Sequence, residues 1–419
     1  MRTTPSFWKV GHWPTLMSAF LYFDVSFMVW VLLGALGNYI ATEFGLNAAQ
    51  KGFMTALPLL GGSGLRLVFG HLTDTIGAKK TGCIGLLLTL VPLLGGWLWA
   101  DSMPKVYGVG LLLGVAGASF AAALPLASRW YPPEYQGLAM GVAGAGNSGT
   151  LFATFFAPRL AERFGWHWAF GLALVPVTIV LLFFFFVAKE PPRPAGRRQN
   201  SEFISVLQER DTGLFSLFYG VTFGGFVGLA SFLPILLRDQ YGVSKVQAGD
   251  LTTLCVLAGS FLRPVGGFLA DRLGGIRMLI VLYGAVALLV STLATLPPLS
   301  LAMIPLLAVM GCLGMGNGAV FQLVPHRFKD RVGVATGILG AAGGLGGFFL
   351  PTVFGSLKQA TGSYGPGLLV FASVALLALL CLGLAQRTWI GVWIARHGRV
   401  PALTSPMISS NGNPEPVLR

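Results

Sequence analysis

The chain has 419 residues, of which 54% are hydrophobic and only 10% are charged, and its formal net charge is +13 at pH 7. Soluble globular chains carry about 25% charged residues, so this chain has too few charges to cover a large soluble core. The composition argues against a soluble enzyme, a disordered protein or a disulfide scaffold, and it predicts an integral membrane protein.

Apolar runs long enough to span a bilayer, which takes ~20 residues per helix, recur twelve times along the chain. They lie near residues 14–38, 52–73, 80–100, 105–128, 138–158, 166–188, 213–237, 247–270, 276–295, 300–324, 333–355 and 364–386. The sequence therefore predicts an all-α membrane protein with twelve transmembrane helices. No signal-peptide cleavage pattern follows the first run, so we expect that run to be the first transmembrane helix.

A polar stretch rich in proline and arginine separates the sixth run from the seventh. We expect an N-terminal six-helix bundle at residues 1–188, a cytoplasmic linker at 189–212, a C-terminal six-helix bundle at 213–386 and a cytoplasmic tail at 387–419.

The basic residues orient the chain. With the N-terminus placed in the cytoplasm, 19 Lys and Arg residues fall in cytoplasmic segments and 7 in outer loops, and the other two of the 28 lie inside apolar runs. Cytoplasmic loops carry the excess of basic residues, so we expect a multi-pass protein of the cytoplasmic (inner) membrane with both termini in the cytoplasm. The charges form short clusters and no continuous basic face, so the expected partner is the lipid bilayer and not nucleic acid.

The two halves repeat one pattern. Four residues of the first half recur 197 residues later: Arg66, Gly70, Asp74 and Gly77 as Arg263, Gly267, Asp271 and Gly274. Three glycines recur at a displacement of 196: Gly137, Gly141 and Gly144 as Gly333, Gly337 and Gly340. This predicts a duplicated six-helix unit and two pseudo-symmetric bundles, which is one known plan for transporters.

Residues 70–80 (GHLTDTIGAKK) and 267–274 (GFLADRLG) resemble the loop motif of the major facilitator superfamily. Glycine allows close helix approach, and the aspartate can meet a helix N-terminus or a basic partner. We assign a structural and gating role to the motif residues Gly70, Asp74, Gly77, Gly267, Asp271 and Gly274.

Two glycine-rich segments, residues 141–149 (GVAGAGNSG) and 337–348 (GILGAAGGLGGF), resemble the nitrate signatures of the nitrate/nitrite porter family within that superfamily. Small residues at this spacing are also a common helix-packing device in membranes. The resemblance favours a substrate-lining role for a set of these residues, namely Gly144, Gly146, Asn147, Gly149, Gly340, Gly343 and Gly344. It also implies a transporter, not an enzyme, with no cofactor or metal.

Arg66 and Arg263 lie inside apolar runs at equivalent depths, where a guanidinium costs at least ~2.5–3.5 kcal/mol. No acid lies one turn from either arginine in its own helix. Two such cations facing one axis describe an anion clamp, and the resemblance implies that they hold the substrate. The alternative is that each arginine bonds to carbonyls or to an acid on another helix.

Further candidates surround this pair. By resemblance, Tyr219, Phe223 and Phe120 could flank a flat anion, although without the resemblance a packing or lipid-facing role is favoured for these aromatic residues. Asn317 is another polar candidate inside a run. Asp24 is the one acid placed well within a run; it could relay protons or pair with a basic residue across the bundle.

We therefore expect a monomeric transporter that takes up nitrate or nitrite by alternating access, with protons as the coupling ion. Nitrate/nitrite antiport, or export of another small or organic anion, is the alternative. A sensor would require a large soluble domain, and no HExxH or GxSxG motif suggests a membrane enzyme.

Overall fold

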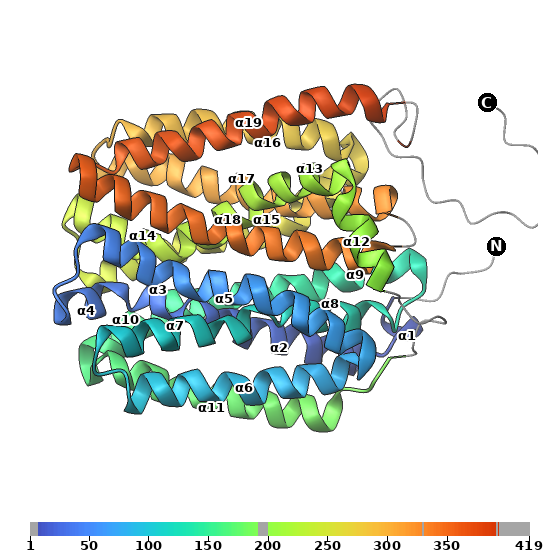
Figure 1. The fold of residues 1–419 in the computed structure, drawn as a ribbon, viewed down its shortest axis with the longest axis horizontal. Helices are drawn as coiled ribbons and strands as arrows, with labels where there is room; N and C mark the ends of the chain where they lie inside the picture. Colours follow the sequence, from blue (N-terminus) through green and yellow to red (C-terminus); the bar gives the residue numbers. More distant parts are fainter. Residues whose placement is uncertain (1–6, 192–199, 329–330, 391–392, 394–419) are drawn as a thin grey trace, which may run out of the picture.

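The computed structural model describes residues 7–191, 200–328, 331–390 and 393. Long helices run side by side along one axis, with the first half of the chain below the second half in Figure 1. The helix α4 lies at one end of this bundle, and α1 and α12 lie at the opposite end. We call these the α4 end and the α12 end.

In the first half, the helices are α1 (Phe7–Val10), α2 (Trp13–Trp30), α3 (Leu32–Ala35), α4 (Gly37–Glu43), α5 (Ala48–Thr75), α6 (Ala78–Leu98), α7 (Met103–Gly117), α8 (Phe120–Ser128), α9 (Pro133–Gly144), η1 (Ala145–Ser148), α10 (Gly149–Phe164) and α11 (Trp166–Val187). In the second half, they are α12 (Asn200–Gln208), α13 (Arg210–Tyr219), η2 (Gly220–Gly224), α14 (Gly225–Tyr241), α15 (Lys245–Leu273), α16 (Gly275–Ala294), α17 (Leu299–Phe328), α18 (Val332–Thr361) and α19 (Gly365–Trp389).

Ten helical stretches of the described chain are long and apolar enough to cross a membrane. The other two expected runs, the first and the fifth, are present as broken helices. The first is divided into α2, α3 and α4, and the fifth into α9, η1 and α10. The helical membrane fold is confirmed. The first and fifth runs differ from the other ten because their helices are short or carry polar residues.

The helices α5 and α15 begin ahead of their apolar runs, at polar capping residues. The side chains of Asn47 and Ser244 each accept a hydrogen bond from the backbone three residues on, and Gln50 and Gln247 bond back, at the starts of α5 and α15. Such capping boxes satisfy backbone N–H groups that the helix leaves free. The starts of α5 and α15 therefore correspond in the two halves.

The outer layer of the bundle faces lipid. The helices α6 and α11 form one edge of the molecule and α16 and α19 the other (Figure 1). They carry many of the exposed large apolar side chains, among them Leu87, Val91, Ile179, Phe186, Val281, Leu288, Leu380 and Leu384. The helices α5, α10, α15 and α18 pack between these edges, where α5 meets α18 and α10 meets α15 across the two halves.

Two ion pairs between described residues join the halves, and both lie at the α4 end. Lys51 on α5 binds Asp239 on α14 at 2.8 Å, and Arg159 on α10 binds Asp250 on α15 at 2.6 Å. Among the described residues, the ion pairs at the α12 end stay within one half; Arg129 and Asp74, at 2.8 Å, are an example. The bundle is therefore fastened across its two halves at the α4 end.

Candidate functional site

Arg66 is fully buried at the middle of the molecule. Its Nε donates a 2.9 Å hydrogen bond to the carbonyl oxygen of Gly117, and its Nη1 donates to the carbonyl oxygen of Gly340 in the other half. Its Nη2 has no hydrogen-bond partner. Two of the three guanidinium nitrogens thus bond to backbone carbonyls, as the alternative interpretation of Arg66 expected. The third, Nη2, is free to donate to a ligand.

Three aromatic rings enclose the same guanidinium. The Arg66 Cζ lies 4.9 Å from the centre of the Trp30 ring, 5.0 Å from that of Phe223 and 5.3 Å from that of Phe120. Cation–π contacts of this kind stabilise a buried guanidinium without neutralising its charge. The net positive charge therefore remains available to an anion.

Arg263 completes the pair from the second half. It lies close enough to Arg66 for the two charges to interact, and Tyr219 interacts electrostatically with both. The Arg263 Nη1 is buried without a hydrogen-bond partner. Within the described parts of the chain, no carboxylate forms an ion pair with either arginine.

Aromatic side chains build a wall beside the two arginines. Tyr219 and Phe223 stack with ring centres 4.9 Å apart and planes 10° apart. Phe321 on α17 packs edge-on against Tyr219 and also contacts Phe120. The predicted residues Tyr219, Phe223 and Phe120 are thus brought together. Trp30 and Phe321 belong to the same wall, but nothing distinguishes them in sequence from ordinary apolar helix residues.

Two buried asparagines lack partners. Asn147 on η1 and Asn317 on α17 are completely buried, and neither the oxygen nor the nitrogen of either side-chain amide makes a hydrogen bond. Leaving a buried polar group unsatisfied costs about 1–3 kcal/mol. Because both amides would lower the stability of the fold if they stayed unsatisfied, we expect them to bind a ligand or water.

The backbone is irregular on both sides of this region. The fifth spanning helix contains the 3₁₀ turn η1, which carries Asn147, and the seventh contains the π turn η2, which carries Phe223. Turns of these kinds within long helices often mark functional sites or hinges. Each half therefore presents one predicted site residue from a local break in a helix.

The predicted glycines divide into two groups. A Cβ added at Gly144 would lie 3.6 Å from the Arg263 guanidinium, one at Gly340 would lie 3.4 Å from the Phe120 ring, and one at Gly343 would meet the Tyr219 and Phe223 rings. These three border the arginine site.

The other three predicted glycines face neighbouring helices. Gly146 and Gly149 contact the backbone of α2 around Asp24, and Gly344 contacts Ser63 on α5. Ser63 donates a 2.5 Å hydrogen bond to the carbonyl oxygen of Ala341, which joins α5 to α18 just beside the site. This contact between the halves has no sequence signal of its own.

Asp24 lies apart from the arginines. Its carboxylate accepts a 2.7 Å hydrogen bond from the Ser148 hydroxyl. It also borders a crevice of about 340 Å³ between α2, α10 and α11, whose walls are otherwise apolar. No ion pair links Asp24 to a basic residue in the described chain, so the alternative of a pairing across the bundle is not observed there.

The loop motifs form matching turns at the α12 end. Gly77 and Gly274 precede α6 and α16 with φ values of +104° and +95°, a conformation that favours glycine. Asp74 pairs with Arg129, whereas Asp271 faces Gln322 and His326. A Cβ at Gly70 would meet no atom within 4 Å, and one at Gly267 would lie 3.9 Å from Gly318 on α17.

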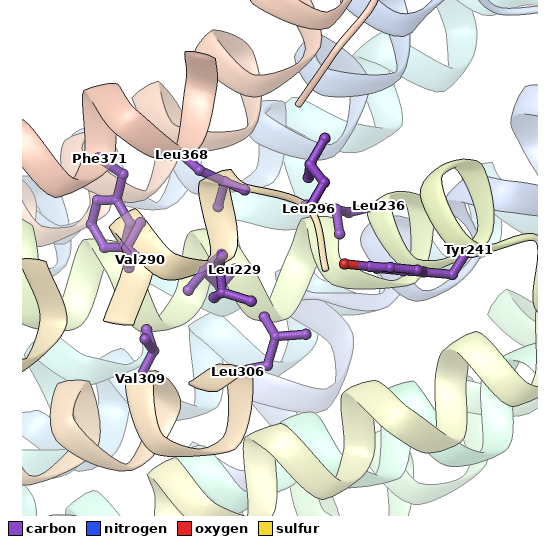
Figure 2. A pocket seen from close by; sticks show the side chains of 10 residues that line it. Leu229, Leu236, Tyr241, Val290, Leu296, Leu306, Val309, Leu368 and Phe371 are labelled. Atoms are coloured by element: carbon purple, nitrogen blue, oxygen red, sulfur yellow. The ribbon is translucent and has the colours of Figure 1, made fainter. Parts of the chain in front are cut away.

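One further cavity can be set aside as a substrate site. It lies in the second half between α14, α16, α17 and α19, is lined almost wholly by aliphatic side chains, and has a volume of about 10 Å³ (Figure 2). That is about the space of a single water molecule. The cavity is a packing defect with no charge that could bind an anion.

The fold and the paired loop motifs define the class of protein to which this chain belongs. Residues 18–351 match the family model of the Major Facilitator Superfamily, so the chain belongs to that superfamily of membrane transporters and is not an enzyme. Solved structures agree on the fold: the xylose transporter XylE from E. coli aligns with a TM-score of 0.70 at 16% identity, covering 88% of this chain and 96% of that one. A bacterial homolog of the human lysosomal transporter Spinster aligns with a TM-score of 0.64 at 18% identity, covering 89% and 96%.

Within the superfamily, the chain is a member of the nitrate/nitrite porter family. It is 35% identical to the "Nitrite extrusion protein" of Bacillus subtilis, covering 84% of this chain and 88% of that protein. It is 34% identical to the "Probable nitrate/nitrite transporter NarK2" of Mycobacterium tuberculosis, covering 87% and 94%. The "Probable nitrate/nitrite antiporter NarK1" of Thermus thermophilus is 32% identical, covering 82% and 84%. The family resemblance found in the glycine-rich segments is confirmed.

Proposed function

We propose that this protein carries nitrate, nitrite or both across the cytoplasmic membrane, and that Arg66 and Arg263 hold the anion. The observation that carries the proposal is the pair of guanidinium groups at the centre of the bundle, each with a nitrogen that lacks a hydrogen-bond partner and neither with a carboxylate partner among the described residues. The names of the relatives supply the identity of the anion.

The surroundings suit a small planar anion. Guanidinium N–H groups are arranged as a planar fork that matches the oxygens of such an ion. The stacked rings of Tyr219 and Phe223 offer a flat wall, and the amides of Asn147 and Asn317 supply unused donors. When the ion loses its water, these donors replace the lost hydrogen bonds. The negative charge of the ion then offsets the repulsion between the two guanidinium groups.

We infer that transport proceeds by alternating access. The ion pairs Lys51–Asp239 and Arg159–Asp250 close the α4 end in the state described here, and they must break before that end can open. The surplus of basic residues favours cytoplasmic termini, so the closed α4 end would face outward and the anion would reach the cytoplasm from this state. We expect one chain to suffice, since both arginines come from the same chain.

Removing one of these ion pairs should shift the protein toward the outward-open state. Partly exposed pairs contribute about 0–1 kcal/mol, so Asp250→Asn should change the ratio of the two states by up to about fivefold. Spin labels on the exposed residue 164 and on residue 243, in a cysteine-free background, would report the distance between the halves. Lys105→Ala, which breaks the Lys105–Asp101 pair inside the first half, is the matched control. Unchanged distances in Asp250→Asn would argue against the gate.

Purified protein in liposomes should accumulate nitrate when a pH gradient, acidic outside, is imposed. Proton-coupled uptake is our first expectation, and exchange for nitrite is the alternative. Flux would be measured with the pH gradient alone and then with nitrite inside and no gradient. A requirement for the gradient supports symport, and flux only with internal nitrite supports antiport. If neither condition produces saturable flux of nitrate or nitrite, the proposed function is wrong.

A further inference from the structure

Asp24 meets the fifth spanning helix where its backbone returns from 3₁₀ to α geometry. The helix α9 ends at Gly144, the turn η1 occupies Ala145–Ser148, and α10 begins at Gly149. The Asp24 Oδ1 accepts the 2.7 Å hydrogen bond from the Ser148 hydroxyl, and the Gly149 N–H lies near the same carboxylate. One side chain of α2 thus contacts the point at which α10 starts.

Two glycines allow α2 to come this close to the fifth spanning helix. A Cβ at Gly146 would lie 2.8 Å from the Asp24 backbone nitrogen, and a Cβ at Gly149 would overlap the Asp24 carbonyl oxygen. The backbones of α2 and η1 are therefore in direct contact on both sides of Ser148. Because backbone atoms cannot move aside as a flexible side chain can, this contact sets where η1 lies relative to α2.

The direction of Ser148 determines that of Asn147. A 3₁₀ turn has three residues per turn, so neighbouring side chains point about 120° apart. Ser148 points toward Asp24, while Asn147 is fully buried with its amide unpartnered. If the Ser148 hydroxyl were released, η1 could rotate or return to α geometry, and either change would turn the Asn147 amide.

The second half has no such carboxylate. Gly346 is equivalent to Gly149 at the displacement of 197, and it meets the backbone of Gly220 as Gly149 meets that of Asp24. The residue in the place of Asp24 is thus a glycine, and there the first helix of the half carries the irregular turn η2. An acid at this contact is therefore not a requirement of the fold.

We infer that Asp24 is a positioning residue, which holds the 3₁₀ turn through Ser148 and so aims the Asn147 amide at the anion held by Arg66 and Arg263. The inference rests on the proposed function. It differs from a proton relay because it depends on the hydrogen-bond acceptor of Asp24 and not on its charge. Asparagine offers the same acceptor at Oδ1 without the charge.

Nitrate uptake by variants in liposomes tests this inference. Asp24→Leu and Ser148→Ala should raise the KM for nitrate by about tenfold, the effect of misplacing one hydrogen bond to an anion, with a smaller change in kcat. Asp24→Asn should stay within about threefold of the wild-type KM. The combination of Asp24→Leu with Asn147→Leu should be no worse than Asn147→Leu alone, because both changes remove the same contact. Met28→Leu, in the wall of the same crevice, is the control.

Three other results would each contradict a different part of this argument. A wild-type KM in Asp24→Leu, or equal damage in Asp24→Asn and Asp24→Leu, would overturn the inference, provided that gel filtration shows folded protein. Asp24→Asn that keeps its KM but loses accumulation driven by the pH gradient would instead assign Asp24 to proton transfer. The absence of saturable flux in the wild type would refute the proposed function itself, and the inference with it.

Discussion

Lysine in place of either Arg66 or Arg263 should reduce nitrate uptake by about 100-fold. At Arg66, lysine keeps the charge but loses the bonds from Nε to Gly117 and from Nη1 to Gly340, and it cannot present a planar fork to the anion. Hydrogen bonds involving a charged group contribute about 1.5–3 kcal/mol, and each 1.4 kcal/mol is a factor of ten. Initial rates of nitrate uptake in proteoliposomes would measure the loss.

Arg163→Lys is a suitable control for these substitutions. Arg163 lies in the last turn of α10, over the ring of Phe164 and away from the centre of the bundle. It should transport at the wild-type rate. Near-normal uptake in both Arg66→Lys and Arg263→Lys would refute the anion clamp, since it would show that a positive charge alone is sufficient.

Alanine at Gly149 or Gly346 should abolish transport and lower the thermal midpoint, whereas alanine at Gly141 or Gly337 should be tolerated. The first two glycines contact the backbones of Asp24 and Gly220, so an added methyl group has no room. Overpacking typically costs 1–3 kcal/mol, and more is expected where backbone atoms cannot yield. No atom lies within 4 Å of a Cβ at Gly141 or Gly337.

The four substitutions form two symmetry-related pairs within the same glycine-rich segments. If the glycines served mainly to keep the helices flexible, all four alanine variants would be impaired alike. If close packing is their main role, only Gly149→Ala and Gly346→Ala should fail. Melting curves of the purified variants, followed by uptake assays on those that fold, would separate the two explanations.

The sequence predicts much of the fold because lipid imposes simple constraints on it. Twelve apolar runs and a repeat at a displacement of 197 appear directly in the chain. The two intramembrane arginines are equally visible, because an unpaired cation in an apolar run is costly. These features depend on composition and spacing alone.

The details of the site depend on helix rotation, which spacing does not specify. Gly144 borders Arg263, whereas Gly146, two residues later, faces α2. An intervening 3₁₀ turn changes which residues share a face, and no local residue pattern distinguishes that turn from regular helix. The sequence does not single out Trp30 and Phe321 for a related reason. An aromatic residue in an apolar helix can face lipid, another helix or a ligand, and the surrounding sequence is similar in all three cases.

The lengths of the helices bear on how the protein responds to bilayer thickness. The helices α17 and α18 have 30 residues each, or about 45 Å at 1.5 Å per residue, well beyond a hydrocarbon core of about 30 Å. The edge helices α6 and α16 have 21 and 20 residues and match that core closely. Both long helices also expose large apolar side chains, such as Ile304 and Phe349, so they meet lipid too and must tilt or extend into the headgroup region. A thicker bilayer should therefore strain the short edge helices α6 and α16 first, at a cost of fractions of a kcal/mol for each ångström of mismatch.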